Sequence, residues 1–398
     1  MKKRNIVLLI FLCLFLGVCI YFYANPTKLK EVYKKCEEFY YDKFEEKIDS
    51  YNEDYRVNSI DYASTYYYLK LNDDEKIIYD YVAYAVKNLK NEIYLQKYEY
   101  VDDKKVSEDI NKAITYFLLD NPEVFYLKQN YLISTNSSIF GTKISLKFEY
   151  LVDSNKDLED KIGTIKEKVD YIKSEVVKDE TDPYQIELKV HDYIAKNTEY
   201  YKYDNTDEIP NEYHNIYGAL VENKAVCDGF AKTFQLILGK YGIDSIVVTG
   251  TLENEPHAWN LVNINDNWYN VDITSAKSIK IENKAIVVHS YFNVTDETIL
   301  KTHKFDNKDI LPTCENTEYN YYVKENKVIK LSENFNEKIK NIVENSDEIL
   351  EFYTTDYTNV PEKLAVAVVK IKNNGFILAT DKEYSYYNIL NTYIMVKK

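Results

Sequence analysis

The stretch from Asn223 to Ala276, NKAVCDGFAKTFQLILGKYGIDSIVVTGTLENEPHAWNLVNINDNWYNVDITSA, decides the fold of this chain. In it, Cys227 precedes a helical pattern, His257 opens a segment with strand character, and Asp272 lies on the next such segment. A thiol, an imidazole and a carboxylate in this order are the groups that a nucleophile, its general base and the orienter of that base require. The stretch therefore predicts a cysteine-based catalytic site.

The residues after Cys227 predict a helix that leads the chain away and a strand that brings it back. A helix of about 14 residues moves the chain roughly 21 Å, and Gly242 stands where a C-cap glycine is expected. The β-branched segment Ile243 to Gly250 then returns it by roughly 26 Å as a strand. The turn at Glu253 to Pro256 places His257 near the level of the cysteine. The apolar residues at helical spacing are Phe230, Phe234, Ile237, Leu238 and Tyr241.

A predicted hairpin carries His257 and Asp272 on its two arms. If the two residues were directly opposite each other, the turn would be centred between Ile264 and Asn265, within the polar stretch 263–267. The pairing is therefore reachable, with a bulge as an option. The cysteine itself lies at a helix N-terminus, where the backbone dipole and free N–H groups favour thiolate over thiol. We expect all three groups to converge.

Around these residues the chain resembles the transglutaminase-like superfamily of papain-fold cysteine enzymes. The resemblance rests on AVCDGFAKTF, HAWNLV and WYNVDIT, and it extends to YGAL upstream (Tyr217 to Leu220) and SYFNVTDE downstream (Ser290 to Glu297). It is strong over roughly 186–303. The segments YYLKLNDDEKIIYDYV and LLDNPEVFYL are more weakly similar to the helical N-terminal region of some bacterial secreted members.

This resemblance implies an α+β, papain-like core in which a cysteine-bearing helix packs on an antiparallel sheet bearing the histidine and the aspartate. It also implies thioester acyl-enzyme chemistry. By the resemblance, Cys227 is the nucleophile, His257 the general base and acid, and Asp272 the orienter. The backbone N–H of the cysteine is a natural oxyanion donor, and Tyr217 is the candidate for a second donor, with a plain core tyrosine as the other interpretation.

The remaining aromatic and histidine residues near the motifs have two interpretations each. Trp259 and Trp268 alternate with the catalytic residues on the same strands, and they either pack around the hairpin or line the groove for the acyl donor. Asp228 suits the first turn of the helix because of the dipole. The other histidines are expected to be structural or on the surface, since the base position is filled: His191, His214, His289 and His303.

The sequence does not identify the acyl acceptor. Water would make the protein a peptidase or amidase, whereas a lysine-type amine would make it a cross-linking transglutaminase. Because bacterial proteins of this kind are often assigned hydrolytic roles, we favour hydrolysis of peptide or cell-envelope amide bonds. A non-catalytic surface protein that binds a partner through this fold is the alternative of another class, and the intact triad argues against it. No cofactor is expected, since nothing indicates a pocket for one.

Composition narrows the partners. The 398 residues of 47.0 kDa allow two or three domains, and the net charge of −15 argues against nucleic acid or an anionic lipid surface as a partner. Five cysteines without a CxxC motif or a Cys/His cluster of zinc spacing predict no metal centre. Of these, Cys36 and Cys314 are interpreted as incidental or structural.

The N-terminus carries a targeting signal. Lys2, Lys3 and Arg4 precede an unbroken apolar run from Ile6 to Tyr23, whose length lies between a signal-peptide core and a spanning helix. Since no small-x-small cleavage site follows, we predict an uncleaved single-pass anchor with the catalytic part outside the cytoplasm. The alternative is a cleaved signal peptide and a secreted protein.

Four parts are predicted along the chain. They are an anchor or signal sequence at 1–26, a mainly helical region at 27–180, a transglutaminase-like catalytic domain at 181–312 and a small α/β domain at 313–398.

Within these parts, helix caps and apolar periodicity place the elements. Helices are expected after Asn72 or Asp73, after Ser107, over 158–176, after Asp182 with Pro183 at the first position, over 296–302 and near 334–345. Strands are expected at 139–151, 287–294, LAVAVVKIK, GFILA and 386–396.

Overall fold

The computed structural model describes most of the chain in twelve ranges and divides it into two compact units. The smaller unit comprises 1–61, 72–114 and 130–149, and the larger comprises 62–71, 115–129 and 150–398. The described residues are 18, 20–32, 34–35, 64–95, 103–138, 141–202, 208–277, 279–281, 284–329, 349–354, 384–389 and 392–397.

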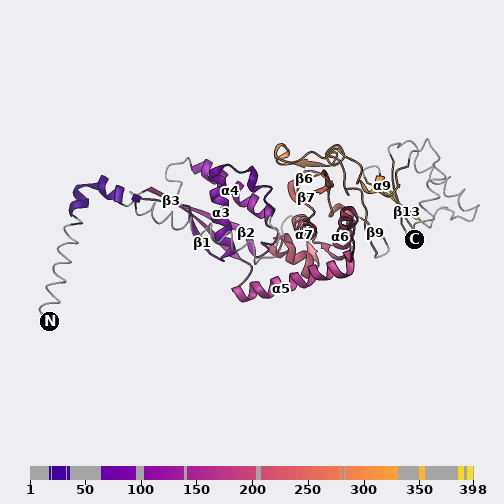
Figure 1. Ribbon diagram of the computed structural model, residues 1–398, viewed down its shortest axis with the longest axis horizontal. Coiled ribbons are helices and arrows are strands. Elements are labelled where there is room, and N and C mark those ends of the chain that lie inside the picture. The colour runs from indigo at the N-terminus through magenta and orange to yellow at the C-terminus, as the bar shows by residue number, and fades with distance from the viewer. Residues whose placement is uncertain are drawn as a thin grey trace, which may run out of the picture. The chain divides into compact units, whose positions relative to one another are not determined.

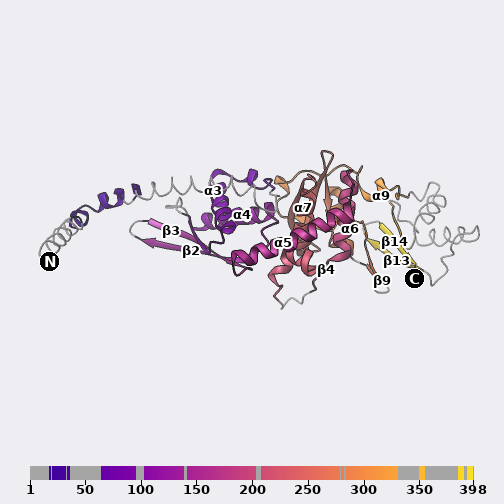
Figure 2. The same ribbon diagram turned by 60° about the horizontal axis from the view of Figure 1, so that its bottom comes forward.

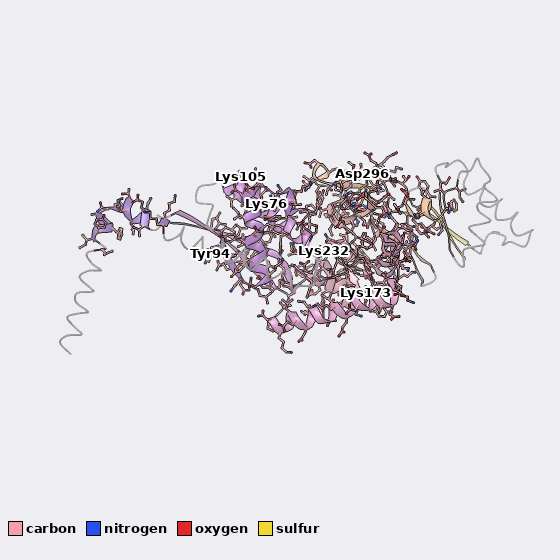
Figure 3. The ribbon with its side chains drawn as sticks, viewed as in Figure 1. Lys76, Tyr94, Lys105, Lys173, Lys232 and Asp296 are labelled. Atoms are coloured by element: carbon pink, nitrogen blue, oxygen red, sulfur yellow. The ribbon has the colours of Figure 1, made fainter. Side chains whose placement is uncertain are left out.

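The smaller unit combines helices with a sheet. Helix α3 (Asp73–Lys87) begins with a capping box, in which Asn72 accepts from the backbone N–H of Glu75 and Glu75 accepts in return, as the sequence predicts. The strands β1 (Glu92–Leu95), β3 (Gly141–Tyr150) and β2 (Leu127–Ser138) form a sheet in the order β1-β3-β2. In Figure 3, Lys76, Tyr94 and Lys105 mark α3, β1 and the start of α4 (Asp103–Asp120).

The prediction of a mainly helical region over 27–180 is wrong at β1 and β2. Strand β1 is only four residues long, and β2 reads LKQNYLISTNSS, which offers no alternating apolar pattern to recognise. The strand predicted at 139–151 is confirmed as β3. Helix α4 starts at Asp103, so Ser107 lies inside the helix and is not its cap.

The larger unit packs helices against a four-stranded antiparallel sheet. The strands β6 (Ser245–Leu252), β7 (Glu255–Ile264) and β8 (Asn267–Val271) follow one another, and β11 (His303–Phe305) pairs with the outer side of β6, so the order is β11-β6-β7-β8. Helix α7 (Cys227–Gly239) lies against β6 and β7, and α6 (Pro183–Asn197) lies beside α7 (Figures 1 and 2).

Helix positions in this unit agree well with the sequence. Asp182 caps α6 by accepting from Gln185 N, with Pro183 at the first position. The amphipathic helix expected over 158–176 is α5 (Asn155–Tyr171), which continues as a π-turn (Ile172–Val177). Helix α7 buries its apolar face, and Gly242 beyond its end has φ +71°, which confirms the left-handed position expected there.

The β7–β8 hairpin closes one residue later than expected. Asn265 and Asp266 both have positive φ and form a two-residue turn, with Ile264 paired to Asn267. The register Asn260↔Val271 places Asp272 beyond the last paired residue, one step past the end of β8. Extended to His257, it offsets His257 and Asp272 diagonally by two residues instead of placing them directly opposite.

Three smaller differences lie downstream. The strand expected at 287–294 is wrong: only Val294 makes an isolated bridge, to Asn270. The helix expected at 296–302 is confirmed as α8 (Asp296–Ile299), capped by Thr295. A short pair, β9 (Ile279–Ile281) with β10 (Lys284–Ile286), has no predicted counterpart.

A C-terminal antiparallel sheet completes the described chain. It has the order β12-β14-β13, formed by Ile349–Tyr353, Thr392–Lys397 and Tyr384–Ile389. The single strand expected at 386–396 is thus wrong, because Ile389 pairs with Thr392 and the segment folds as a hairpin. The predicted helix near 334–345, the strands LAVAVVKIK and GFILA, and Cys36 lie outside the described residues.

Within the described ranges, no helix combines the length and apolarity needed to cross a membrane. Most of the apolar run from Ile6 to Tyr23 lies outside those ranges. The membrane anchor and the extracytoplasmic location remain predictions.

Candidate active site

Cys227 is the first residue of α7 and is partly exposed to solvent. The residue before it, Val226, has extended backbone dihedrals and contributes no side-chain cap. No N-cap side chain therefore accepts from the first turn, where Asp228 Oδ1 takes up only the N–H of Gly229, and the positive end of the helix dipole faces the sulfur. This confirms the position predicted for the cysteine and provides backbone donors for an oxyanion.

His257 and Asp272 meet beside this helix end. His257 Nε2 donates to Asp272 Oδ2 over 3.1 Å, and both side chains are buried. Cys227 lies close enough to His257 to raise the pKa of its imidazole. Since Nε2 faces the carboxylate, Nδ1 is the nitrogen left to face the sulfur. The structure thus brings together the three residues that the sequence singles out.

The charges of this site favour a protonated His257. Burial lowers the pKa of its imidazole, but the charge and hydrogen bond of Asp272, followed by the contact with Cys227, outweigh burial and raise the pKa to about 10. At neutral pH the imidazole therefore carries a proton that it can give to a leaving group.

Asp272 is held by its own loop as well as by the histidine. Its Oδ1 accepts from the backbone N–H and hydroxyl of Thr274 at 3.0 and 2.6 Å, and Ser275 Oγ donates to Oδ2. Burial raises the pKa of Asp272, but His257 and then His303 pull it well below its usual range. Asp272 is therefore an ionised, fully coordinated carboxylate in the position of an orienter.

Comparison with known proteins agrees with this geometry. The transglutaminase-like superfamily matches residues 170–273, a range that includes Cys227, His257 and Asp272. The chain carries a transglutaminase-like domain. Its core is of the α+β, papain-like kind, with the cysteine on a helix and the histidine and aspartate on and beside an antiparallel sheet.

Similarity to solved structures is distant, and no curated protein matches. A crystal structure of a TGase shares 18% identity at a TM-score of 0.26, over 50% of this chain and 54% of that one. A provisionally assigned cysteine protease from Cytophaga hutchinsonii shares 18% at 0.23, over 40% and 66% of the two chains. A provisionally assigned protease from Parabacteroides distasonis shares 11% at 0.21, over 40% and 42%. This chain thus spans less than two thirds of each of the three.

Trp259 packs against the ring of His257. It is 1% exposed, so it cannot contact a substrate, and packing is the interpretation that the structure favours over lining a groove. Its ring stacks on His257 with centroids 6.2 Å apart, and its Nε1 donates to Asn270 Oδ1. Trp268 is partly exposed and lies by Tyr66, away from the triad residues.

Tyr217 makes contacts typical of packing. Its ring stacks on Phe125 with centroids 5.8 Å apart, and Lys161 Nζ lies 5.6 Å from the ring centre. Its backbone N–H donates to Asn215. None of these partners belongs to the triad, and the oxyanion role of Tyr217 remains a prediction.

A carboxylate with two side-chain partners lies at the start of α7. Asp228, directly after the nucleophile, contacts His214 Nδ1 at 3.0 Å and Lys232 Nζ at 3.5 Å. Burial raises the pKa of Asp228, but Lys232 and His214 hold it below its ordinary value. Lys232, labelled in Figure 3, also donates to the carbonyl of His214. These contacts fix the first turn that carries Cys227.

His303 is the site residue that the sequence interpretation missed. It is fully buried, and its Nε2 lies 3.3 Å from Asp272 Oδ2, the same oxygen that accepts from His257. The histidine reaches this position because β11 adds to the edge of β6, with His303 opposite Leu252. A three-residue strand leaves no periodic pattern, so only the apolar neighbour at Phe305 indicated that the segment could be buried.

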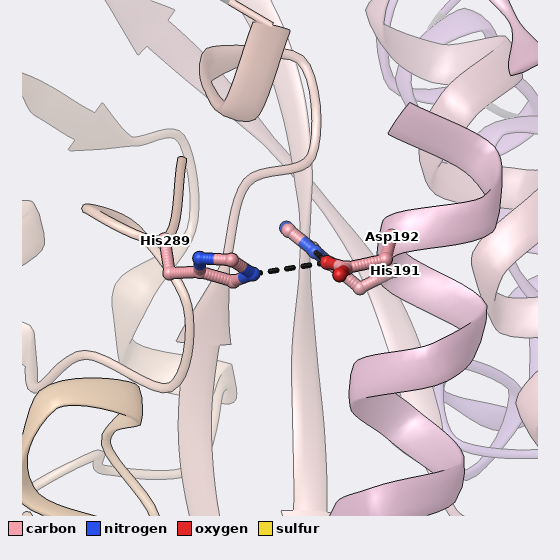
Figure 4. Close-up of side chains that lie close together, drawn as sticks. All are labelled: His191, Asp192 and His289. Carbon is pink, nitrogen blue, oxygen red and sulfur yellow. Dashed lines mark hydrogen bonds and ion pairs between the residues drawn. The ribbon is translucent and has the colours of Figure 1, made fainter. Parts of the chain in front are cut away.

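Another histidine cluster includes two consecutive residues of α6. His191 Nδ1 and His289 Nε2 both contact Asp192 Oδ1, at 3.0 and 2.9 Å (Figure 4). His289 Nδ1 faces Glu351 Oε2 at 2.9 Å, so this histidine bridges α6 and β12.

Side chains of types that bind metal ions gather within 4.8 Å at two places in the described part of the chain. In both, one carboxylate oxygen already contacts two imidazoles, so a hydrogen-bond network accounts for the geometry. The absence of a metal centre remains a prediction. The two groups are His191, Asp192 and His289, and His257, Asp272 and His303.

The His289 contacts predict a loss of stability in alkaline solution. Burial lowers the pKa of His289, but Glu351 and Asp192 outweigh it and raise the pKa to about 9. Because the folded-state pKa lies above the unfolded value, this contribution is complete below about pH 6.5 and is lost as the pH rises through about 9. Its size is on the order of 3 kcal/mol.

Thermal unfolding of the wild type and of Glu351→Gln between pH 6 and pH 10 checks this. His257 adds a similar alkaline dependence to both proteins, so the difference between them isolates His289. We expect the variant to be less stable at pH 6 and the two curves to converge towards pH 10. Parallel curves would show that the contact carries no proton-linked stability.

Proposed function

We propose that this protein is a cysteine acyl-transfer enzyme that acts on amide bonds of peptides or proteins. The observation that carries the proposal is the buried contact between His257 Nε2 and Asp272 Oδ2. This contact leaves the other ring nitrogen, Nδ1, to face Cys227 at the N-terminus of a helix. The match to the transglutaminase-like superfamily supports it. We favour hydrolysis over amine transfer, and a cell-envelope substrate met outside the cytoplasm.

The mechanism follows from the order of these groups. The Cys227 thiolate attacks the amide carbonyl, and the oxyanion forms beside the backbone N–H groups at the start of α7. The imidazolium of His257 gives its proton to the departing amine or ammonia, which leaves a thioester on the sulfur. Neutral His257 then takes a proton from the acceptor, water or an amine, and the acyl group leaves the enzyme. Asp272 keeps the ring in one orientation throughout.

A glutamine-containing protein tests the reaction. The full-length wild type and Cys227→Ala are incubated with it, with and without a labelled primary amine, and the products are examined by intact-mass and peptide mass spectrometry. Amine incorporation that the variant lacks identifies a transglutaminase. Cleavage or deamidation without incorporation identifies a hydrolase.

The same experiment can turn against the proposal. If the wild type and Cys227→Ala give identical products, and Cys227 of the wild type also resists iodoacetamide at pH 6, the proposed chemistry is wrong. A protein that binds a partner through this fold is then the better description. Cys314 does not confuse the labelling, because it is buried and burial raises the pKa of its thiol.

A further inference from the structure

A series of hydrogen-bonded side chains leads to Asp272. Tyr291 Oη lies 3.1 Å from Thr302 Oγ1, and Thr302 Oγ1 lies 2.9 Å from His303 Nδ1. His303 Nε2 then faces Asp272 Oδ2 at 3.3 Å, and that oxygen faces His257 Nε2 at 3.1 Å. The contacts form one line of partners that leads from a tyrosine hydroxyl to the catalytic imidazole.

Asp272 determines the role of His303 Nε2. An ionised carboxylate has no proton to give, so the nitrogen that faces Asp272 carries the hydrogen and donates. Nδ1 faces the hydroxyl of Thr302, which also lies 3.5 Å from the carbonyl oxygen of Ile299. The donor role of His303 towards Asp272 is therefore imposed by the carboxylate itself.

Packing leaves the His303 ring no other position. Its centroid lies 5.0 Å from the ring of Trp259 and 5.3 Å from that of Tyr291, both in edge-on geometry. It lies 5.5 Å from the His257 ring. Tyr291 also accepts the backbone N–H of Asp272 at its carbonyl, over 3.1 Å. Two segments that follow the hairpin thus contact Asp272. Tyr291 binds its backbone N–H, and His303 binds its side chain.

We infer that His303 is a positioning residue for the triad, which holds Asp272 Oδ2 at a fixed point between two imidazoles. The inference rests on the proposed roles of Cys227, His257 and Asp272. Thr274 anchors Oδ1 of the carboxylate and Ser275 Oγ donates to Oδ2, the oxygen that has to stay in line with His257. A second, buried imidazole donor keeps it there without adding a group that touches substrate.

The test separates hydrogen bonding from packing by two substitutions. His303→Leu fills space but cannot donate, whereas the side-chain amide of His303→Gln can donate to Oδ2. The readout is the rate at which iodoacetamide alkylates the peptide containing Cys227 at pH 6, which reports the thiolate–imidazolium pair and needs no substrate. His191→Leu is the matched control, since it removes another buried histidine that contacts neither Asp272 nor Cys227.

We expect His303→Leu to slow alkylation by about tenfold, in keeping with the loss of a hydrogen bond to a charged group. His303→Gln should recover most of the wild-type rate, and His191→Leu should match the wild type. Near-ultraviolet circular dichroism establishes that each variant is folded. A folded Leu variant that reacts as fast as the wild type, or faster, overturns the inference. Equal losses in the Leu and Gln variants would overturn it too, because packing alone would then explain them.

Failure of this inference and failure of the proposed function can be told apart. If the wild type transfers no acyl group but its alkylation depends on His303 as described, the positioning role stands and the reaction is wrong. If acyl transfer occurs, the His303→Leu defect should appear in kcat, with KM changed by no more than about threefold, because His303 does not contact substrate.

Discussion

Asp272→Asn is expected to lower kcat/KM for acyl transfer by about three to four orders of magnitude, the scale on which a triad fails when its orienter loses its charge. Two effects act in the same direction. The amide removes the charge of Asp272, which is the largest contribution that raises the pKa of His257 to about 10, so that only the contact with Cys227 then opposes burial and the pKa falls. The amide NH₂ can also donate to His257 Nε2, which would place the proton of the neutral ring on Nδ1, the nitrogen that has to face Cys227.

A matched control exists one residue after the nucleophile. Asp228 is also a carboxylate close to Cys227, but it pairs with His214 and Lys232 and does not face His257. We expect Asp228→Asn to lower kcat/KM by less than about tenfold, through looser packing of the helix start. Alkylation of Cys227 at pH 6 should follow the same order. Equal effects of the two substitutions would mean that Asp272 is not the orienter.

Gly250→Ala is expected to produce the largest loss of stability in the sheet. A Cβ atom at Gly250 would lie 1.9 Å from the carbonyl oxygen of Lys304 and 2.9 Å from Trp259 Cη2. Gly250 pairs with His257 on one side and with Phe305 on the other, so neither neighbouring strand can move without disturbing the site. The closest of these atoms belongs to the backbone of β11, which therefore has to separate from β6.

We expect this substitution to lower the free energy of unfolding by at least about 3 kcal/mol, as overpacking against backbone does. Urea denaturation measures the change. Gly163→Ala is the control, because Gly163 is exposed on α5 and a Cβ atom there would have no neighbour within 4 Å. Alanine should stabilise that helix by up to about 1 kcal/mol. A Gly250 variant as stable as the wild type would mean that β11 does not pair with β6 as described.

The convergence of Cys227, His257 and Asp272 could be predicted from the sequence because each of them lies on or next to a regular element. The helix period after Cys227, the turn before His257 and the polar turn of the hairpin together bring the three groups to one place. The predicted centre of the hairpin turn differs by one residue because Asn265 and Asp266, which both adopt positive φ, form a tighter turn than the polar stretch around them suggests.

His303 and Glu351 could not be predicted, for a different reason. Each acts through a partner that is distant in sequence: 31 residues separate His303 from Asp272, and 62 separate His289 from Glu351. Neither lies on an element long enough to show a period. Strand β2 could not be recognised because its polar residues do not alternate with apolar ones. Local patterns identify elements, but they do not reveal which short strands will join an edge.

The two-residue turn of the β7–β8 hairpin also bears on the order in which the site assembles during folding. Only 15 residues separate His257 from Asp272, and such a hairpin closes within microseconds because little loop entropy opposes it. Helix α7 precedes the hairpin in the sequence and strand β11 follows it, so both join the hairpin through contacts of longer range. His257 and Asp272 therefore meet first, and Cys227 is brought to an imidazole whose orientation is already set. A chain still emerging from the ribosome has no complete triad until the longer-range contacts form.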